Sequence, residues 1–110
     1  MEKETIGLIE RIIKSKIKYS VIRKFQNKEV YLIKSKKKKY ILKIYLDSFS
    51  KLLSEKELYG YKLLKKVKIF NIPRLYFFKK GTKFNYLLLD YINGKKKVFY
   101  ILVSLSFIIF

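Results

Sequence analysis

Two charged residues, Lys43 and Glu57, interrupt runs of apolar side chains. Lys43 lies inside YILKIYL (40–46), a stretch of β-branched and aromatic residues that predicts a strand. Because alternate residues of a strand face opposite sides, Lys43 shares a face with Ile41 and Tyr45. A lysine on such a face loses hydration unless a carboxylate hydrogen-bonds it.

Glu57 is the acid that can provide this compensation. It belongs to a predicted helix, 50–70, and the apolar stripe on its side of that helix consists of Leu53, Gly60 and Leu64. Like the lysine in the strand, this glutamate is a charged residue in apolar surroundings, and the nearby glycine allows the helix to approach the strand closely. We therefore expect the two charged groups to form an ion pair. The alternative is that the lysine reaches solvent at a sheet edge and the glutamate is solvated.

The segments that must position this pair alternate between helical and strand-like periodicity. In order they predict a helix, three strands, a helix and two strands. Their ranges are 4–16, 18–25, 29–35, 40–46, 50–70, 74–78 and 84–92. This order predicts an α+β fold, a five-stranded antiparallel sheet with an N-terminal helix and one packed helix between the third and fourth strands.

The chain is strongly basic, with 27 Lys+Arg against 8 Asp+Glu and a formal charge of +19. Such a balance is typical of proteins that bind nucleic acid or an anionic membrane surface. The lysines, however, are spread along nearly the whole chain, as in the product of an AT-rich genome, so nucleic acid is not the expected partner. A small basic protein that binds nucleic acid or an anionic membrane is the alternative function.

The sequence contains no cysteine and no histidine. This composition excludes disulfides, the common zinc sites and the Ser/His or Cys/His dyads of nucleophilic catalysis. We assign no metal ligand and no catalytic residue in this chain. The N-terminal residues mix acids with bases and lack a continuous apolar run, so we expect no signal peptide and a cytoplasmic location.

Four segments, EVYLIKSKKKKYILKIY, SEKELYGYKLLKK, IFNIPRLYFF and YLLLDYINGK, resemble in this order the N-terminal lobe of the aminoglycoside phosphotransferase and choline kinase family. That family is the small-molecule branch of the protein-kinase-like fold, and its complete members use ATP with magnesium. The resemblance covers roughly residues 17–97. It implies a kinase-like small lobe in which Lys43 binds the α- and β-phosphates of ATP and Glu57 holds that lysine in place.

The same resemblance implies the remaining nucleotide-binding residues. LLDYING (88–94) matches the hinge that holds adenine, with Leu89 at the gatekeeper position. The Asp90 carbonyl and the Ile92 amide would hydrogen-bond the ring. Asn27 falls in the turn that covers the phosphates, although that turn lacks the glycine that close backbone approach favours.

The resemblance does not extend to the catalytic lobe, which in the family carries a base aspartate and a magnesium-binding aspartate. This chain has no acidic residue after Asp90. We therefore expect the truncated nucleotide-binding lobe of an ATP-dependent small-molecule phosphotransferase, inactive alone unless another chain supplies the missing lobe. Whether the chain acts as part of an enzyme stays open at this point.

The last residues, 98–110, are uncharged and differ sharply from the preceding sequence. We expect residues 1–97 to form the lobe and 98–110 a hydrophobic tail, which is shorter than the ~20 residues that a membrane-spanning helix requires. Three interpretations of the tail remain: the truncated or out-of-frame end of a longer ancestor, a terminal strand or core helix, and a membrane-contacting segment behind a basic cluster.

Overall fold

The computed structural model describes residues 1–66 and 74–91. Within them the order is helix, three strands, helix and two strands, as the sequence predicts. The elements are α1 (Lys3–Ile13), β1 (Lys18–Lys24), β2 (Lys28–Lys34), β3 (Lys39–Tyr45), α2 (Ser48–Lys66), β4 (Leu75–Lys80) and β5 (Asn85–Asp90).

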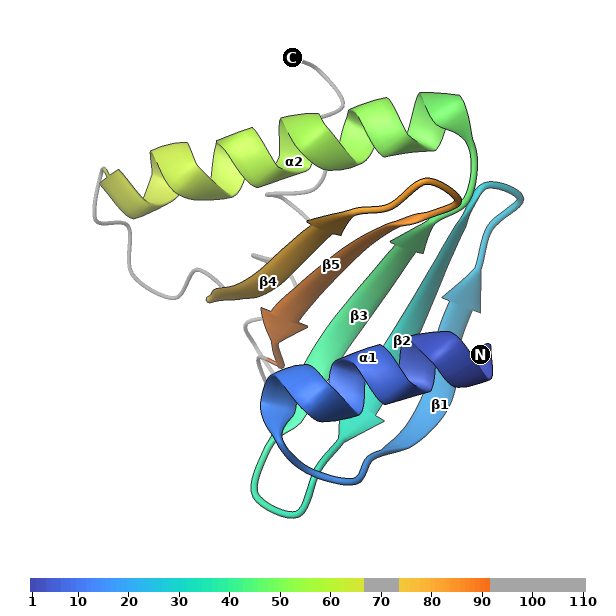
Figure 1. The fold of residues 1–110 in the computed structure, drawn as a ribbon. Helices are drawn as coiled ribbons and strands as arrows, with labels where there is room; N and C mark the ends of the chain where they lie inside the picture. The colour runs from blue at the N-terminus through green and yellow to red at the C-terminus, as the bar shows by residue number, and fades with distance from the viewer. Residues whose placement is uncertain (67–73, 92–110) are drawn as a thin grey trace.

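The strands form one sheet in the order β1-β2-β3-β5-β4, and every neighbouring pair is antiparallel (Figure 1). This arrangement confirms the predicted α+β fold with a five-stranded antiparallel sheet. The central strand is β3, which pairs with β2 on one side and β5 on the other. Lys43 therefore lies in the middle of the sheet rather than at an edge.

One face of the sheet is covered by α1. The buried Ile9 of this helix packs in a cluster with side chains from β2, β3 and β5. The sheet members are Tyr31, Ile33, Tyr40, Leu42, Ile44 and Leu88. Helix α1 is amphipathic, as its spacing of isoleucines predicts, and buries one apolar side on the sheet.

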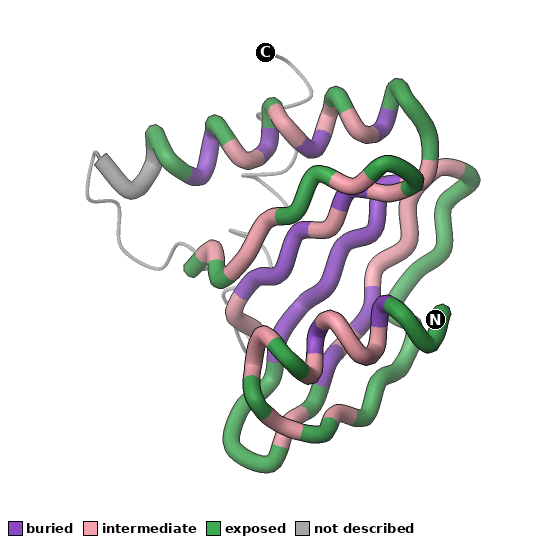
Figure 2. The backbone as a smooth tube through the Cα atoms, viewed as in Figure 1, coloured by how far each residue is buried: buried purple, intermediate pink, exposed green. Residues whose placement is uncertain are grey.

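The opposite face of the sheet packs against α2. Tyr61 of this helix forms a second buried cluster with Ile41, Tyr45, Leu87 and Leu89. The two clusters draw alternate residues from β3, as the two-residue repeat of a strand requires. Figure 2 shows the buried positions concentrated in β3 and β5 and on the sheet side of α2, whereas β1 is exposed along its length.

Asp47 determines where α2 begins. Its Oδ1 accepts a hydrogen bond from the Ser50 amide at 2.7 Å, and the Ser50 hydroxyl accepts one from the Asp47 amide at 3.1 Å. These reciprocal bonds satisfy amides at the helix start, and the bonds from Ser50 lower the pKa of Asp47. The helix consequently starts at Ser48, slightly before the predicted 50, and follows β3 almost directly.

The expected hydrophobic tail, 98–110, and the division at residue 97 lie outside the described residues. Of the helices in the described part of the chain, none has the length and apolar character needed to cross a membrane.

Candidate functional site

Lys43 occupies the centre of the face that α2 covers. It pairs in register with Val30 on β2 and with Leu87 on β5, and it is only 3% exposed to solvent. A central strand with neighbours on both sides leaves the lysine side chain no edge over which to reach water. The alternative of a lysine that reaches solvent at a sheet edge is therefore wrong.

Glu57 of α2 supplies the expected carboxylate. Its Oε1 forms a buried ion pair with Lys43 Nζ, which confirms the predicted pairing. Its Oε2 accepts a hydrogen bond from the hydroxyl of Tyr45, two residues along β3 from the lysine. Each carboxylate oxygen thus has its own donor from the same strand, and the glutamate is held at a defined position above the sheet.

A buried ion pair of this kind is a poor source of stability. Removing both charges from water costs several kcal/mol per ion, and replacing such pairs by apolar residues is often neutral or stabilising. Since apolar neighbours surround the pair on β3 and β5, a leucine in place of each charge would fit the pattern of the core. Stability alone therefore does not explain the pair, and its burial between the central strand and α2 makes it the candidate functional site.

Lys28, at the start of β2, brings a second cation to the same area. It pairs in register with Tyr45, and its Nζ lies 5.7 Å from the centroid of that ring and 5.1 Å from the centroid of the Phe25 ring. Burial lowers the pKa of Lys28, and the charge of Lys43 lowers that pKa further, while Glu57 acts in the opposite direction. Lys28 thus belongs electrostatically to the site of the ion pair.

The turn between β1 and β2 is fastened to the end of β3. The Asn27 carbonyl accepts a hydrogen bond from the Leu46 amide at 3.0 Å, and the Phe25 amide donates to the Lys28 carbonyl at 2.7 Å. The structure therefore places Asn27 just beyond the strand that carries Lys43. Its role in covering phosphates stays a prediction.

The predicted hinge residues are placed to different extents. Leu89 is fully buried on β5, opposite Ile41 and on the same face as Lys43, two residue pairs further along the sheet. Asp90 ends β5, and its Oδ1 forms an ion pair with Lys38 Nζ at 2.9 Å. Ile92 lies outside the described residues.

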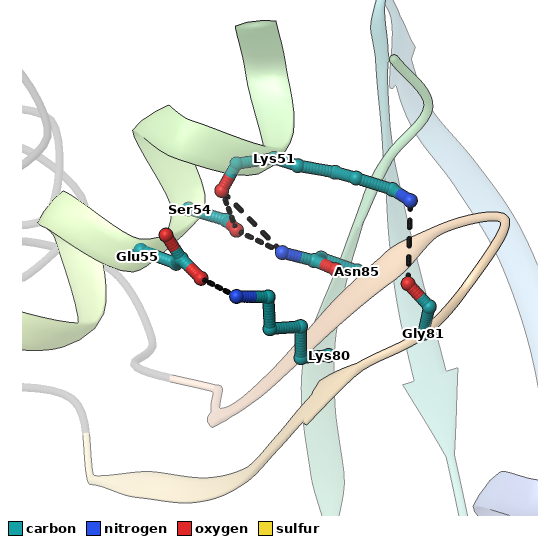
Figure 3. A network of polar contacts seen from close by, with 6 residues as sticks. All are labelled: Lys51, Ser54, Glu55, Lys80, Gly81 and Asn85. Atoms are coloured by element: carbon teal, nitrogen blue, oxygen red, sulfur yellow. Dashed lines mark hydrogen bonds and ion pairs between the residues drawn. The ribbon is translucent and has the colours of Figure 1, made fainter. Parts of the chain in front are cut away.

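A polar network that the sequence did not predict holds α2 onto the hairpin of β4 and β5 (Figure 3). Asn85 Nδ2 donates to the Ser54 hydroxyl at 2.9 Å, in a fully buried contact between β5 and α2. Lys51 Nζ donates to the carbonyls of Gly81 and Thr82 at 3.2 and 2.8 Å. These contacts lie within two turns of Glu57 and fix the half of the helix that carries it.

One further contact in this network lies nearer the surface. Lys80 Nζ and Glu55 Oε1 are 2.7 Å apart, in a pair whose side chains are 72% and 38% exposed. Exposed pairs of this kind contribute ~0–1 kcal/mol. The buried contact between Asn85 and Ser54 is therefore the stronger constraint on the position of α2.

A metal centre does not fit the donor set of the described residues. Within 1–66 and 74–91, no cluster of three or more His, Cys, Asp or Glu residues is close enough to hold a metal ion. The site instead offers ammonium groups, which bind anions, with phosphate as the common biological ligand of lysine.

Comparison with known proteins identifies the fold. No protein-family model matches the sequence, and no curated protein sequence matches it significantly. Solved structures do match. A fructosamine-3-kinase-like protein from Haemophilus somnus 129PT superposes with a TM-score of 0.63 at 21% identity, covering 89% of this chain and 35% of its own.

A second match is spectinomycin phosphotransferase APH(9)-Ia, determined in complex with ADP and spectinomycin. It superposes with a TM-score of 0.64 at 20% identity, covering 86% of this chain and 30% of its own. The chain thus spans about a third of the length of either protein. The fold is that of a kinase-like small lobe, as the sequence resemblance implies.

Proposed function

We propose that the chain is the nucleotide-binding lobe of an ATP-dependent small-molecule phosphotransferase of the aminoglycoside phosphotransferase and choline kinase type. The observation that carries this proposal is the buried pair of Lys43 and Glu57, formed between the central strand and the helix of a kinase-like sheet. Both structural matches are phosphotransferases by description, and one was determined with ADP bound.

In this function Lys43 binds the phosphates of the nucleotide as a positive charge, and Glu57 holds the ammonium group in position. Tyr45 fixes the glutamate through the second carboxylate oxygen. Leu89 borders the adenine, while the backbone groups of Asp90 and Ile92 hydrogen-bond the ring. Asn27 lies over the phosphates.

Binding of ADP tests the proposal. Calorimetric titration of the chain with ADP should give binding that Lys43→Met weakens by about tenfold or more, as expected for loss of a charge-assisted hydrogen bond. Lys62→Met, which removes an exposed lysine from α2, is the matched control and should bind as the parent does. Equal affinities for the parent and Lys43→Met would refute the assigned role of Lys43.

Residues 1–110 by themselves are proposed to bind nucleotide without transferring phosphate. None of its residues after Asp90 is acidic, and general-base and metal-binding carboxylates are needed in kinase-like phosphoryl transfer. Incubation with ATP and magnesium and with aminoglycosides or choline should therefore give no phosphorylated product. Turnover by the purified chain would contradict this part of the proposal.

A further inference from the structure

Lys28 is a cation that lies close to the ion pair of Lys43 and Glu57 and, in the described part of the chain, does not itself pair with a carboxylate. It is half-buried, and within residues 1–66 and 74–91 no carboxylate forms an ion pair with it. Its neighbour Glu29 points to the other face of the sheet, where it accepts a hydrogen bond from Tyr31 at 2.9 Å and lies 4.0 Å from Lys24. Position 28 thus keeps a positive charge that the fold leaves unbalanced.

The charges around this position leave a net positive site. Lys43 and Glu57 cancel, and both oxygens of Glu57 already have a donor. Lys28 adds one positive charge, and Arg23 adds a second nearby, with its guanidinium 4.7 Å from the centroid of the Phe25 ring. The groups that act on Lys28 electrostatically are therefore two cations and one carboxylate that is already engaged.

The aromatic contacts alone do not account for this arrangement. A lysine over an aromatic ring gains ~0.5–2 kcal/mol. Burial and the repulsion from Lys43 oppose the charged form of Lys28, since both lower its pKa. A methionine would keep the contacts of the lysine stem with Phe25 and Tyr45 and avoid that cost. Lys28 therefore brings an ammonium group to the aromatic rings beside the ion pair, where an anionic ligand would neutralise it.

We propose that Lys28 is a second phosphate-binding residue of this site, which together with Lys43 receives the two phosphates of a nucleoside diphosphate or the terminal phosphates of a triphosphate. This inference rests on the proposed nucleotide-binding function. It adds a preference for polyphosphate. Because the site has two lysines and one glutamate that is already bonded, its affinity should be highest for a ligand that carries several negative charges.

The test is a set of titrations of the full chain with ADP, AMP, adenosine and inorganic pyrophosphate, in EDTA and again with magnesium. The variants are Lys28→Met, Lys28→Arg and, as a matched control from the other end of the same strand, the exposed Lys34→Met. Circular dichroism establishes that each variant is folded. Lys28→Met should bind ADP and pyrophosphate about tenfold or more weakly, with adenosine affinity unchanged. Lys28→Arg should retain most of the affinity, and Lys34→Met all of it.

The other outcomes separate this inference from the proposed function. If Lys28→Met binds ADP as the parent does while Lys43→Met does not, the second phosphate contact is overturned and the nucleotide site stands. If the parent binds pyrophosphate through Lys28 but neither ADP nor adenosine, the lysine binds phosphate and the nucleotide function fails. If the parent binds none of the four ligands, both proposals are overturned.

Discussion

Lys43 on β3 and Glu57 on α2 form a buried ion pair, with side chains 3% and 9% exposed. This pair links the centre of the sheet to the helix through two charges, in addition to the apolar packing of Tyr61. The position of α2 and the orientation of the lysine are consequently linked, and a shift of the helix would release the ammonium group. Contacts that fix the helix, such as that between Asn85 and Ser54, therefore also fix the lysine.

Removing one member of the pair should be more harmful than removing both. Lys43→Met and Glu57→Leu each leave a buried charge without its partner, and each should lower the free energy of unfolding by ~3–5 kcal/mol. The double variant should lose much less than the sum of the two. Urea denaturation measures all three, and Lys80→Met, which breaks an exposed pair, should cost ~0–1 kcal/mol. Single variants as mild as this control would show that the pair is not buried as described.

Tyr45 should contribute by hydrogen-bonding the glutamate. Tyr45→Phe keeps the packing of the ring but leaves Glu57 Oε2 without this donor, and should cost ~1–3 kcal/mol in urea denaturation. Tyr59→Phe removes a hydroxyl from an exposed residue of α2 and should have no measurable effect. A loss of similar size in both variants would point to a general effect of the phenol rather than to this contact.

Ser54 should anchor α2 to the sheet. Ser54→Ala removes the 2.9 Å acceptor of Asn85 Nδ2 and leaves this buried donor only a long contact with the Lys51 carbonyl at 3.4 Å, which should cost ~1–3 kcal/mol. Hydrogen exchange of the α2 amides should become faster. The exposed Ser48 at the start of the helix provides a control, since Ser48→Ala should leave both quantities nearly unchanged. Unaltered exchange in Ser54→Ala would contradict the anchoring role.

Lys28 should make the stability of the chain depend on pH in an identifiable direction. Because its pKa in the folded chain lies below the usual 10.5, the unfolded chain binds more protons than the folded chain in the interval between the two values. The charged lysine thus lowers stability at pH 7, and this penalty is relieved as the pH rises through that interval. Lys28→Met should have a higher Tm than the parent at pH 7, with a smaller difference near pH 10.

The control for this measurement is Lys34→Met, in which an exposed lysine of the same strand is replaced. Its Tm should differ little from that of the parent, and this difference should not shrink between pH 7 and pH 10 as it does for Lys28→Met. A lower Tm for Lys28→Met at pH 7, with a gap independent of pH, would show that the ammonium group stabilises the fold through its aromatic contacts.

The ion pair was predictable because each member contradicts the apolar pattern around it. A charge inside YILKIYL and an acid inside an apolar helical stripe are both visible in the sequence. The carboxylate of the acid can offset the hydration that the buried lysine loses. The strands and helices were predictable because the spacing of their apolar residues is regular. The differences lie at the ends, where a local contact decides: the bond between Asp47 and Ser50 starts α2 earlier, and β4 continues to Lys80, which pairs with Asn85.

The other members of the site were not predictable from residue type. Tyr45 looks like any aromatic residue of a strand, and only the position of Glu57 above it reveals the hydrogen bond. Lys28 is hidden in a lysine-rich sequence, and its proximity to Lys43 results from the pairing of β2 with β3. Asn85 follows a turn, where asparagine is ordinarily a surface residue, and its burial depends on α2 crossing that end of the sheet.

The most direct test of the nucleotide-phosphate site is covalent labelling with an ADP derivative that carries a reactive acyl phosphate at its terminal phosphate. Such a reagent acylates the lysine amines that lie beside the bound phosphates, and peptide mass spectrometry identifies them. We predict that Lys43 and Lys28 are labelled in preference to exposed lysines such as Lys34 and Lys62, and that excess ADP suppresses this labelling. Labelling spread over the exposed lysines, with no protection of Lys43 or Lys28 by ADP, would contradict the account.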